Sequence, residues 1–143
     1  MYEFLLNFHN TLRWLLLPLL LAVIAFSWMG VAGKRSYAKS DKTLGGILVG
    51  MAHLQLILGL ILLFVSPVVQ TALQDFGAAM KDAPVRKVVL EHPLIGLIGV
   101  ALIQIGRTRS KNASGDMKKH KAVAVFTTIA LVLILSRIPH WNF

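Results

Sequence analysis

The sequence contains no cysteine and few charged residues of either sign. Among its 143 residues, Asp, Glu, Lys and Arg together make up 15%, and only six are acidic. Without cysteine the chain cannot form disulfides, thiolate metal sites or iron–sulfur clusters, and it lacks the Cys-x-x-Cys-His run that attaches c-type haem. With so few charges it also lacks the polar surface that a soluble domain of this length needs.

Apolar side chains are abundant and gather in four long segments. The chain is 56% hydrophobic with a mean hydropathy of +0.69, and the segments cover about residues 4–31, 44–66, 88–106 and 119–138. Each is close to or above the length of about 20 residues that an α-helix needs to cross a bilayer core. The first is too long for a signal-peptide h-region. We therefore predict a single domain of the all-α class, an integral membrane up-down-up-down four-helix bundle in the lipid bilayer.

The net charge of +9 is unevenly distributed along the chain. The first and third connections, together with the first three residues of the fourth segment, hold ten basic residues, whereas the second connection, residues 67–87, holds three. No basic face is interleaved with aromatic side chains, so we do not expect nucleic acid as a partner. By the positive-inside rule, the first and third connections face the cytoplasm and both termini face outward, into the periplasm.

Four histidines, His9, His53, His92 and His120, fall one on each apolar segment. A lone histidine in a membrane helix usually packs through a hydrogen bond, but four at paired depths suggest metal ligands. His9 and His92 lie about 8 and 6 Å below the outer edge, and His53 and His120 about 20 and 25 Å below it. In an up-down bundle the first and third segments are diagonal, as are the second and fourth. The sequence therefore predicts an outer pair, His9 with His92, and an inner pair, His53 with His120.

Haem is the metal group that best fits two such pairs. Zinc would need its ligands clustered in one place, whereas a flat macrocycle between diagonal helices receives one imidazole on each face. Both axial positions of the iron are then filled, which suits electron transfer rather than oxygen chemistry. We predict haem b, two per chain, with a single haem as the alternative. His120 lies among lysines and could instead be a solvated interfacial residue, which is also our interpretation of His140.

Small and basic residues lie near the predicted ligands. Arg13 is one turn beyond His9 and would be costly at that depth unless paired with a haem propionate or with Glu91. Arg137, near the outer edge, is a second candidate for binding a propionate. Glycines at helical spacing from His53 and His92 could accommodate a porphyrin or could simply pack helices together, and both interpretations stay open. They are Gly46, Gly50, Gly96 and Gly99.

Four short stretches resemble a known family. They are FHNTLRW (Phe8–Trp14), AHLQL (Ala52–Leu56), EHP (Glu91–Pro93) and KHK (Lys119–Lys121). Together they are similar to small bacterial membrane proteins of the four-helix cytochrome b561-like type. The resemblance implies b-type haem held by paired histidines in the bacterial inner membrane. It also implies electron exchange with a quinol or with a partner redox protein.

The predicted function is therefore that of a b-type di-haem cytochrome carrying electrons across or within the membrane. It would work alone, as a homo-oligomer, or as a small subunit of a larger membrane oxidoreductase. The main alternative is a non-redox structural or assembly subunit, whose histidines would hydrogen-bond to partner helices. A transporter or proton conductor is a third possibility, but the chain lacks paired intramembrane carboxylates and broken inverted repeats.

Overall fold

The computed structural model describes residues 1–139, and its regular structure is entirely helical. His140 and its predicted interfacial role lie outside the described residues. Along the described chain the elements are α1 (Tyr2–Ala32), α2 (Lys39–Val65), α3 (Pro67–Gln74), α4 (Phe76–Lys81), α5 (Ala83–Arg86), the π-helix η1 (Lys87–Glu91), α6 (His92–Asn112) and α7 (Asp116–Ser136). Four continuous helices are long and apolar enough to cross a membrane: α1, α2, the run Ala83–Asn112, and α7. The predicted all-α, multi-pass class is confirmed.

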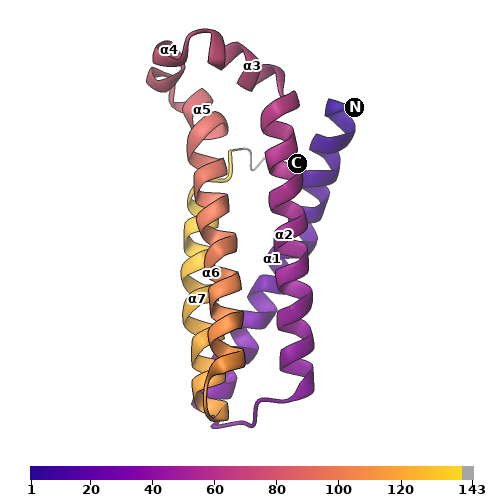
Figure 1. The fold of residues 1–143 in the computed structure, drawn as a ribbon, viewed down its shortest axis with the longest axis vertical. Helices are drawn as coiled ribbons and strands as arrows, with labels where there is room; N and C mark the ends of the chain where they lie inside the picture. The colour runs from indigo at the N-terminus through magenta and orange to yellow at the C-terminus, as the bar shows by residue number, and fades with distance from the viewer. Residues whose placement is uncertain (140–143) are drawn as a thin grey trace.

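The four long helices form an up-down bundle (Figure 1). Helix α1 packs against α2 and α7, and α6 packs against the same two helices. Thus α1 and α6 are diagonal partners, as are α2 and α7. The two short connections, residues 33–38 and 113–115, lie at one end of the bundle, and α3–α5 form an arch at the other (Figure 1). The basic residues of the first and third connections therefore share one end.

The second connection, residues 67–87, folds into three short helices, α3 to α5, and the first residue of η1. Pro67 occupies the first turn of α3, where its missing N–H costs nothing. Asp75 and Asp82 cap the next two helices, accepting hydrogen bonds from the backbone N–H groups of Ala78 (3.0 Å) and Val85 (3.1 Å). A Ser-Pro pair followed by capping aspartates is a recognisable helix-start signal, so the sequence did contain this information.

A π-helical turn lies directly before His92. Pro93 has no N–H, so it cannot donate to the carbonyl four residues earlier in an otherwise continuous helix. The helix widens there, and the N–H of His92 bonds to the carbonyl of Lys87, five residues back. Such single π turns often occur at functional sites. Pro93 thus sets how Glu91 and His92 project from the helix.

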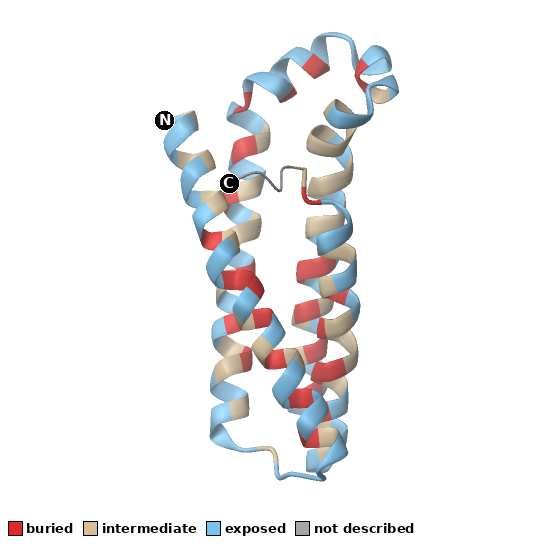
Figure 2. Ribbon diagram, turned by 180° about the vertical axis from the view of Figure 1, so that it is seen from behind, coloured by how far each residue is buried: buried red, intermediate tan, exposed pale blue. Residues whose placement is uncertain are grey.

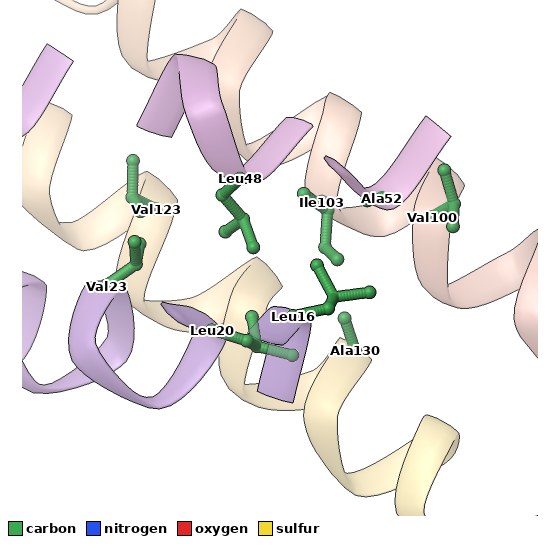
Figure 3. Packing of buried hydrophobic residues seen from close by; sticks show 9 residues of the cluster. All are labelled: Leu16, Leu20, Val23, Leu48, Ala52, Val100, Ile103, Val123 and Ala130. Carbon is green, nitrogen blue, oxygen red and sulfur yellow. The ribbon is translucent and has the colours of Figure 1, made fainter. Parts of the chain in front are cut away.

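The apolar core is formed by side chains that pack together between the helices (Figure 3). Its members come from all four long helices: Leu16, Leu20, Val23, Leu48, Ala52, Val100, Ile103, Val123 and Ala130. The outward faces of the helices are largely exposed (Figure 2) and carry many large apolar residues, as helices surrounded by lipid require. Two members of this cluster, Leu16 and Val100, also line the cavity described below, so the core borders the candidate site.

Candidate cofactor site

A cavity of about 180 Å³ lies among the long helices in the half of the bundle nearer α3–α5. On this measure a single buried water needs only about 10–15 Å³, so the cavity can hold a much larger ligand. Most of its lining is apolar, contributed by leucine, valine and isoleucine side chains. The polar groups that line it include His9, Arg13, Gln55 and His92. Few, converging polar groups in an apolar pocket are typical of cofactor and ligand sites.

The predicted outer histidines meet in this cavity. The ring centres of His9, on α1, and His92, on α6, are 6.2 Å apart, with their planes at 89°. Two imidazoles that bind one metal from opposite sides have ring centres about 6 Å apart, because each metal–nitrogen bond is about 2 Å long and each ring adds about 1 Å. The spacing of these two side chains, contributed by diagonal helices, therefore suits a shared metal centre.

His92 is oriented by the end of α7. Its Nδ1 lies 3.0 Å from the backbone carbonyl oxygen of Arg137. A carbonyl only accepts, so Nδ1 carries the proton and the lone pair of the neutral ring is on Nε2. A ligating histidine typically donates its other ring N–H in this way. The Arg137 side chain, predicted to bind a propionate, contacts Glu91 at 3.1 Å.

His9 is held by Gln55 of α2. The Gln55 side-chain amide nitrogen donates to the His9 carbonyl (3.1 Å) and lies 3.3 Å from His9 Nε2. Two buried atoms, His9 Nδ1 and Gln55 Oε1, have no hydrogen-bond partner among residues 1–139. Each such buried group costs about 1–3 kcal/mol, which a polar ligand could offset. Gln55 was not predicted as a site residue, although an amide inside an apolar segment was the available signal.

Arg13 and two glycines complete this side of the cavity. The Arg13 guanidinium lies 5.4 Å from the centre of the Trp14 ring and lines the cavity, as predicted for a cation near the outer site. A Cβ at Gly59 would lie 3.3 Å from the His9 ring, whereas a Cβ at Gly96 would meet nothing within 4 Å. Gly96 therefore leaves open space beside His92.

The other glycines divide between packing and open space. A Cβ at Gly99 would lie 2.7 Å from Ile134, and one at Gly46 would lie 3.1 Å from Arg107. Both glycines thus have a packing role. Gly50 has nothing within 4 Å and, unlike Gly96, does not line the cavity.

The two histidines predicted to form the inner pair, His53 and His120, lie at different distances from the inner end of the bundle. His53 is exposed on the outside of α2, because its neighbour Ala52 is the residue that points into the core. Helices α2 and α7 both begin at the end with the short connections (Figure 1), and by helical rise His53 lies about 21 Å and His120 about 6 Å from those starts. The predicted depths of these two histidines were counted from the outer ends of their helices, as if those ends were level. Helix α2 has 27 residues and α7 has 21, so their outer ends are not level.

His120 is enclosed by protein at the inner end of the bundle. Only 1% of it is exposed, its Nε2 donates to the carbonyl of Arg35 (3.1 Å), and the Tyr37 ring lies 5.0 Å away. A Cβ at Gly30 would lie only 2.5 Å from its Nδ1. The ring is therefore packed between the end of α1 and the 33–38 connection, where protein and not solvent surrounds it, and its role as a ligand stays a prediction.

Charged side chains near His120 form hydrogen bonds that hold the 33–38 connection and the adjoining helix ends in place. Both guanidinium nitrogens Nη1 and Nη2 of Arg35 donate to Asp41 at 2.8 Å, and these bonds raise the pKa of Arg35 above its usual range. The Asp41 carboxylate also accepts from the Ala38 N–H at 2.9 Å. Lys119 Nζ donates to the Ser110 carbonyl at 3.1 Å, at the end of α6, where a cation is favourable. These groups stabilise the inner end of the fold.

Within the described part of the chain, no group of three or more His, Cys, Asp or Glu side chains could hold a metal ion. The His9–His92 pair therefore offers two protein ligands, fewer than the three or four that protein zinc sites use. Neither a protein-family model, nor a curated protein, nor a solved structure matches this chain. The similarity to cytochrome b561-like proteins accordingly stays a prediction.

Proposed function

We propose that the bundle binds one b-type haem between His9 and His92 and acts as a membrane electron-transfer protein. The observation that carries this proposal is the 6.2 Å separation of the two rings across an intramembrane cavity. Within residues 1–139 no further His, Cys, Asp or Glu forms a ligand group with the two imidazoles, which suits a porphyrin because it would bring nitrogen ligands of its own. When bound, haem supplies reversible one-electron chemistry at its iron.

The residues around the cavity have distinct roles in this proposal. His92 presents Nε2 because Arg137 holds Nδ1, and Gln55 fixes the position of His9. Arg13 offers positive charge to an anionic substituent such as a propionate. Leucine and valine side chains around the rings exclude water. With an imidazole on each side there is no open coordination position, which favours electron transfer over oxygen chemistry.

The location of the site also limits its electron partners. We place the protein in the bacterial inner membrane, with the basic end in the cytoplasm by the positive-inside rule. The His9–His92 cavity is then in the periplasmic half of the bilayer. One haem in that half does not make a path across the whole membrane. We therefore expect exchange with a quinol or a redox protein that reaches the outer half of the bundle.

A visible spectrum tests the proposal directly. Protein purified from haem-replete cells should give a reduced b-type spectrum, with about one haem per chain by pyridine haemochrome assay. A folded but colourless preparation would contradict it. Two haems per chain would instead restore a second site that includes His53 or His120.

One observation favours a second candidate function, that of a subunit packed against another membrane helix. His53 is exposed in the middle of α2, where its imidazole would face lipid. Polar side chains inside a bilayer usually face protein or water, because leaving them in hydrocarbon is costly. A partner helix with a hydrogen-bonding side chain would remove that cost. This role is compatible with haem binding, because His53 is not among the residues that line the cavity.

Replacing His53 with leucine should therefore weaken association while leaving haem content unchanged. Cross-linking in native membranes and mass analysis in nanodiscs would report the assembly state of His53→Leu. The matched control is Ile57→Leu, one turn further along the same exposed face, which should not alter assembly. If wild type and His53→Leu are equally monomeric, the exposed imidazole has no such partner.

A further inference from the structure

Glu91 links three elements at the outer rim of the cavity. One carboxylate oxygen accepts from Arg86 Nε of α5 at 2.8 Å, and the other contacts Arg137 Nε, just beyond α7, at 3.1 Å. Arg86 is anchored in turn by donating to the Met80 carbonyl at 2.7 Å. Glu91 thus ties the end of the α3–α5 arch and the end of α7 to the start of α6.

The π-helical turn makes this arrangement possible. Arg86 and Glu91 are five residues apart, a spacing that places two side chains on different faces of a regular α-helix. In a π turn, where backbone bonds join residues five apart, these positions are stacked. Pro93 removes the N–H that a regular α-helix would use, so the same proline that widens the helix also brings Glu91 over Arg86.

The network ends at the His92 ring. Arg137 contacts Glu91 through its side chain and accepts from His92 Nδ1 through its backbone carbonyl, at 3.0 Å. Arg137 lies beyond the last residue of α7, so its carbonyl is not held by a regular helix. We propose that Glu91 is a positioning residue: by fixing Arg137, it holds the carbonyl that sets the tautomer and orientation of His92.

This inference rests on the proposed function only in its consequence for haem. A carbonyl that accepts from Nδ1–H makes Nε2 a stronger electron donor. A haem held by His92 would then have its ferric form favoured over its ferrous form, and its reduction potential would be lower. Loss of the contact with Glu91 would let Arg137 move and so would weaken the hydrogen bond between its carbonyl and His92 Nδ1. Without Glu91, His92 should therefore exchange between tautomers, and the potential of a bound haem should rise.

Glu91→Gln tests the proposal, because it keeps the side-chain shape and removes the charge. Nitrogen-15 NMR of labelled histidine, recorded on haem-free protein in nanodiscs, should show the Nδ1–H tautomer of His92 in wild type and a mixture in Glu91→Gln. Redox titration of haem-loaded protein should show a higher midpoint potential in the variant. Glu91→Asp should restore part of both signals. Glu3→Gln, an exposed acid in the first turn of α1, is the matched control and should change neither.

The outcomes separate this inference from haem binding itself. An unchanged His92 tautomer in Glu91→Gln overturns it, as does an unchanged potential in loaded protein. If wild type binds no haem, the proposed function fails, yet the NMR comparison still decides the role of Glu91. If Glu91→Gln does not fold, Arg137→Gln replaces it, because that change breaks the same contact while keeping the backbone carbonyl. It should produce the same tautomer mixture.

Discussion

Purified His92→Ala protein is expected to lack haem, and His9→Ala should behave in the same way. Each change removes one of the two nitrogens placed across the cavity, and no third His, Cys, Asp or Glu in the described chain forms a ligand group with them. Loss of either axial ligand of a bis-imidazole haem removes its low-spin spectrum and commonly the haem itself. The measurement is haem per chain, together with the reduced visible spectrum.

His53→Ala is the matched control for this experiment. It also removes an imidazole from a membrane helix, but one that is exposed and does not line the cavity. Its haem content and spectrum should equal those of wild type. If His53→Ala loses haem while His92→Ala retains it, the ligand assignment is wrong. Helical content by circular dichroism shows whether any loss reflects unfolding instead.

Gly30→Ala should destabilise the protein by about 1–3 kcal/mol, the range for overpacking a filled interior. The added methyl carbon would lie 2.5–2.6 Å from three atoms of the His120 ring, and that ring is fixed by its bond to Arg35. This cost exceeds the gain of up to about 1 kcal/mol that alanine brings to a helix interior. Thermal unfolding in detergent, followed by circular dichroism, should show a lower midpoint.

Two comparisons separate overpacking from a general effect of the added methyl group. Gly50→Ala places a Cβ where nothing lies within 4 Å, so it should leave the midpoint unchanged or raise it. In a Gly30→Ala, His120→Ala double variant, the ring that clashes is gone, so the penalty of the alanine at position 30 should largely disappear. Additive penalties would show that Gly30 and His120 do not interact.

Much of the architecture could be predicted because lipid imposes a strong constraint on sequence. A backbone that crosses the bilayer must satisfy its own hydrogen bonds, so four long apolar segments dictate four helices. Short connections then make sequential helices neighbours, which places α1 diagonal to α6 and α2 diagonal to α7. From that order and the early positions of His9 and His92 on their segments, their meeting could be anticipated.

The rotation of each helix was decided only by the tertiary structure. Helix α2 carries apolar side chains on all of its faces, because the face toward lipid and the face toward the core must both be apolar. The hydrophobic pattern of its sequence therefore does not show which face points into the bundle. Packing turns Ala52 inward, and consequently His53 points out while Gln55 reaches His9. The inner pair was therefore predicted from residue type and depth alone, without knowledge of direction.

Contacts between distant chain ends also required the folded structure. His120 packs against Gly30 and donates to the backbone carbonyl of Arg35, and His92 donates to the backbone carbonyl of Arg137. Every residue has a backbone carbonyl, so the sequence does not show which carbonyl accepts a given hydrogen bond. The sequence alone thus determined the membrane class, the number of spans and the outer histidine pair. Which histidines face a cavity, lipid or a packed interior depended on helix length and rotation, which are set by packing.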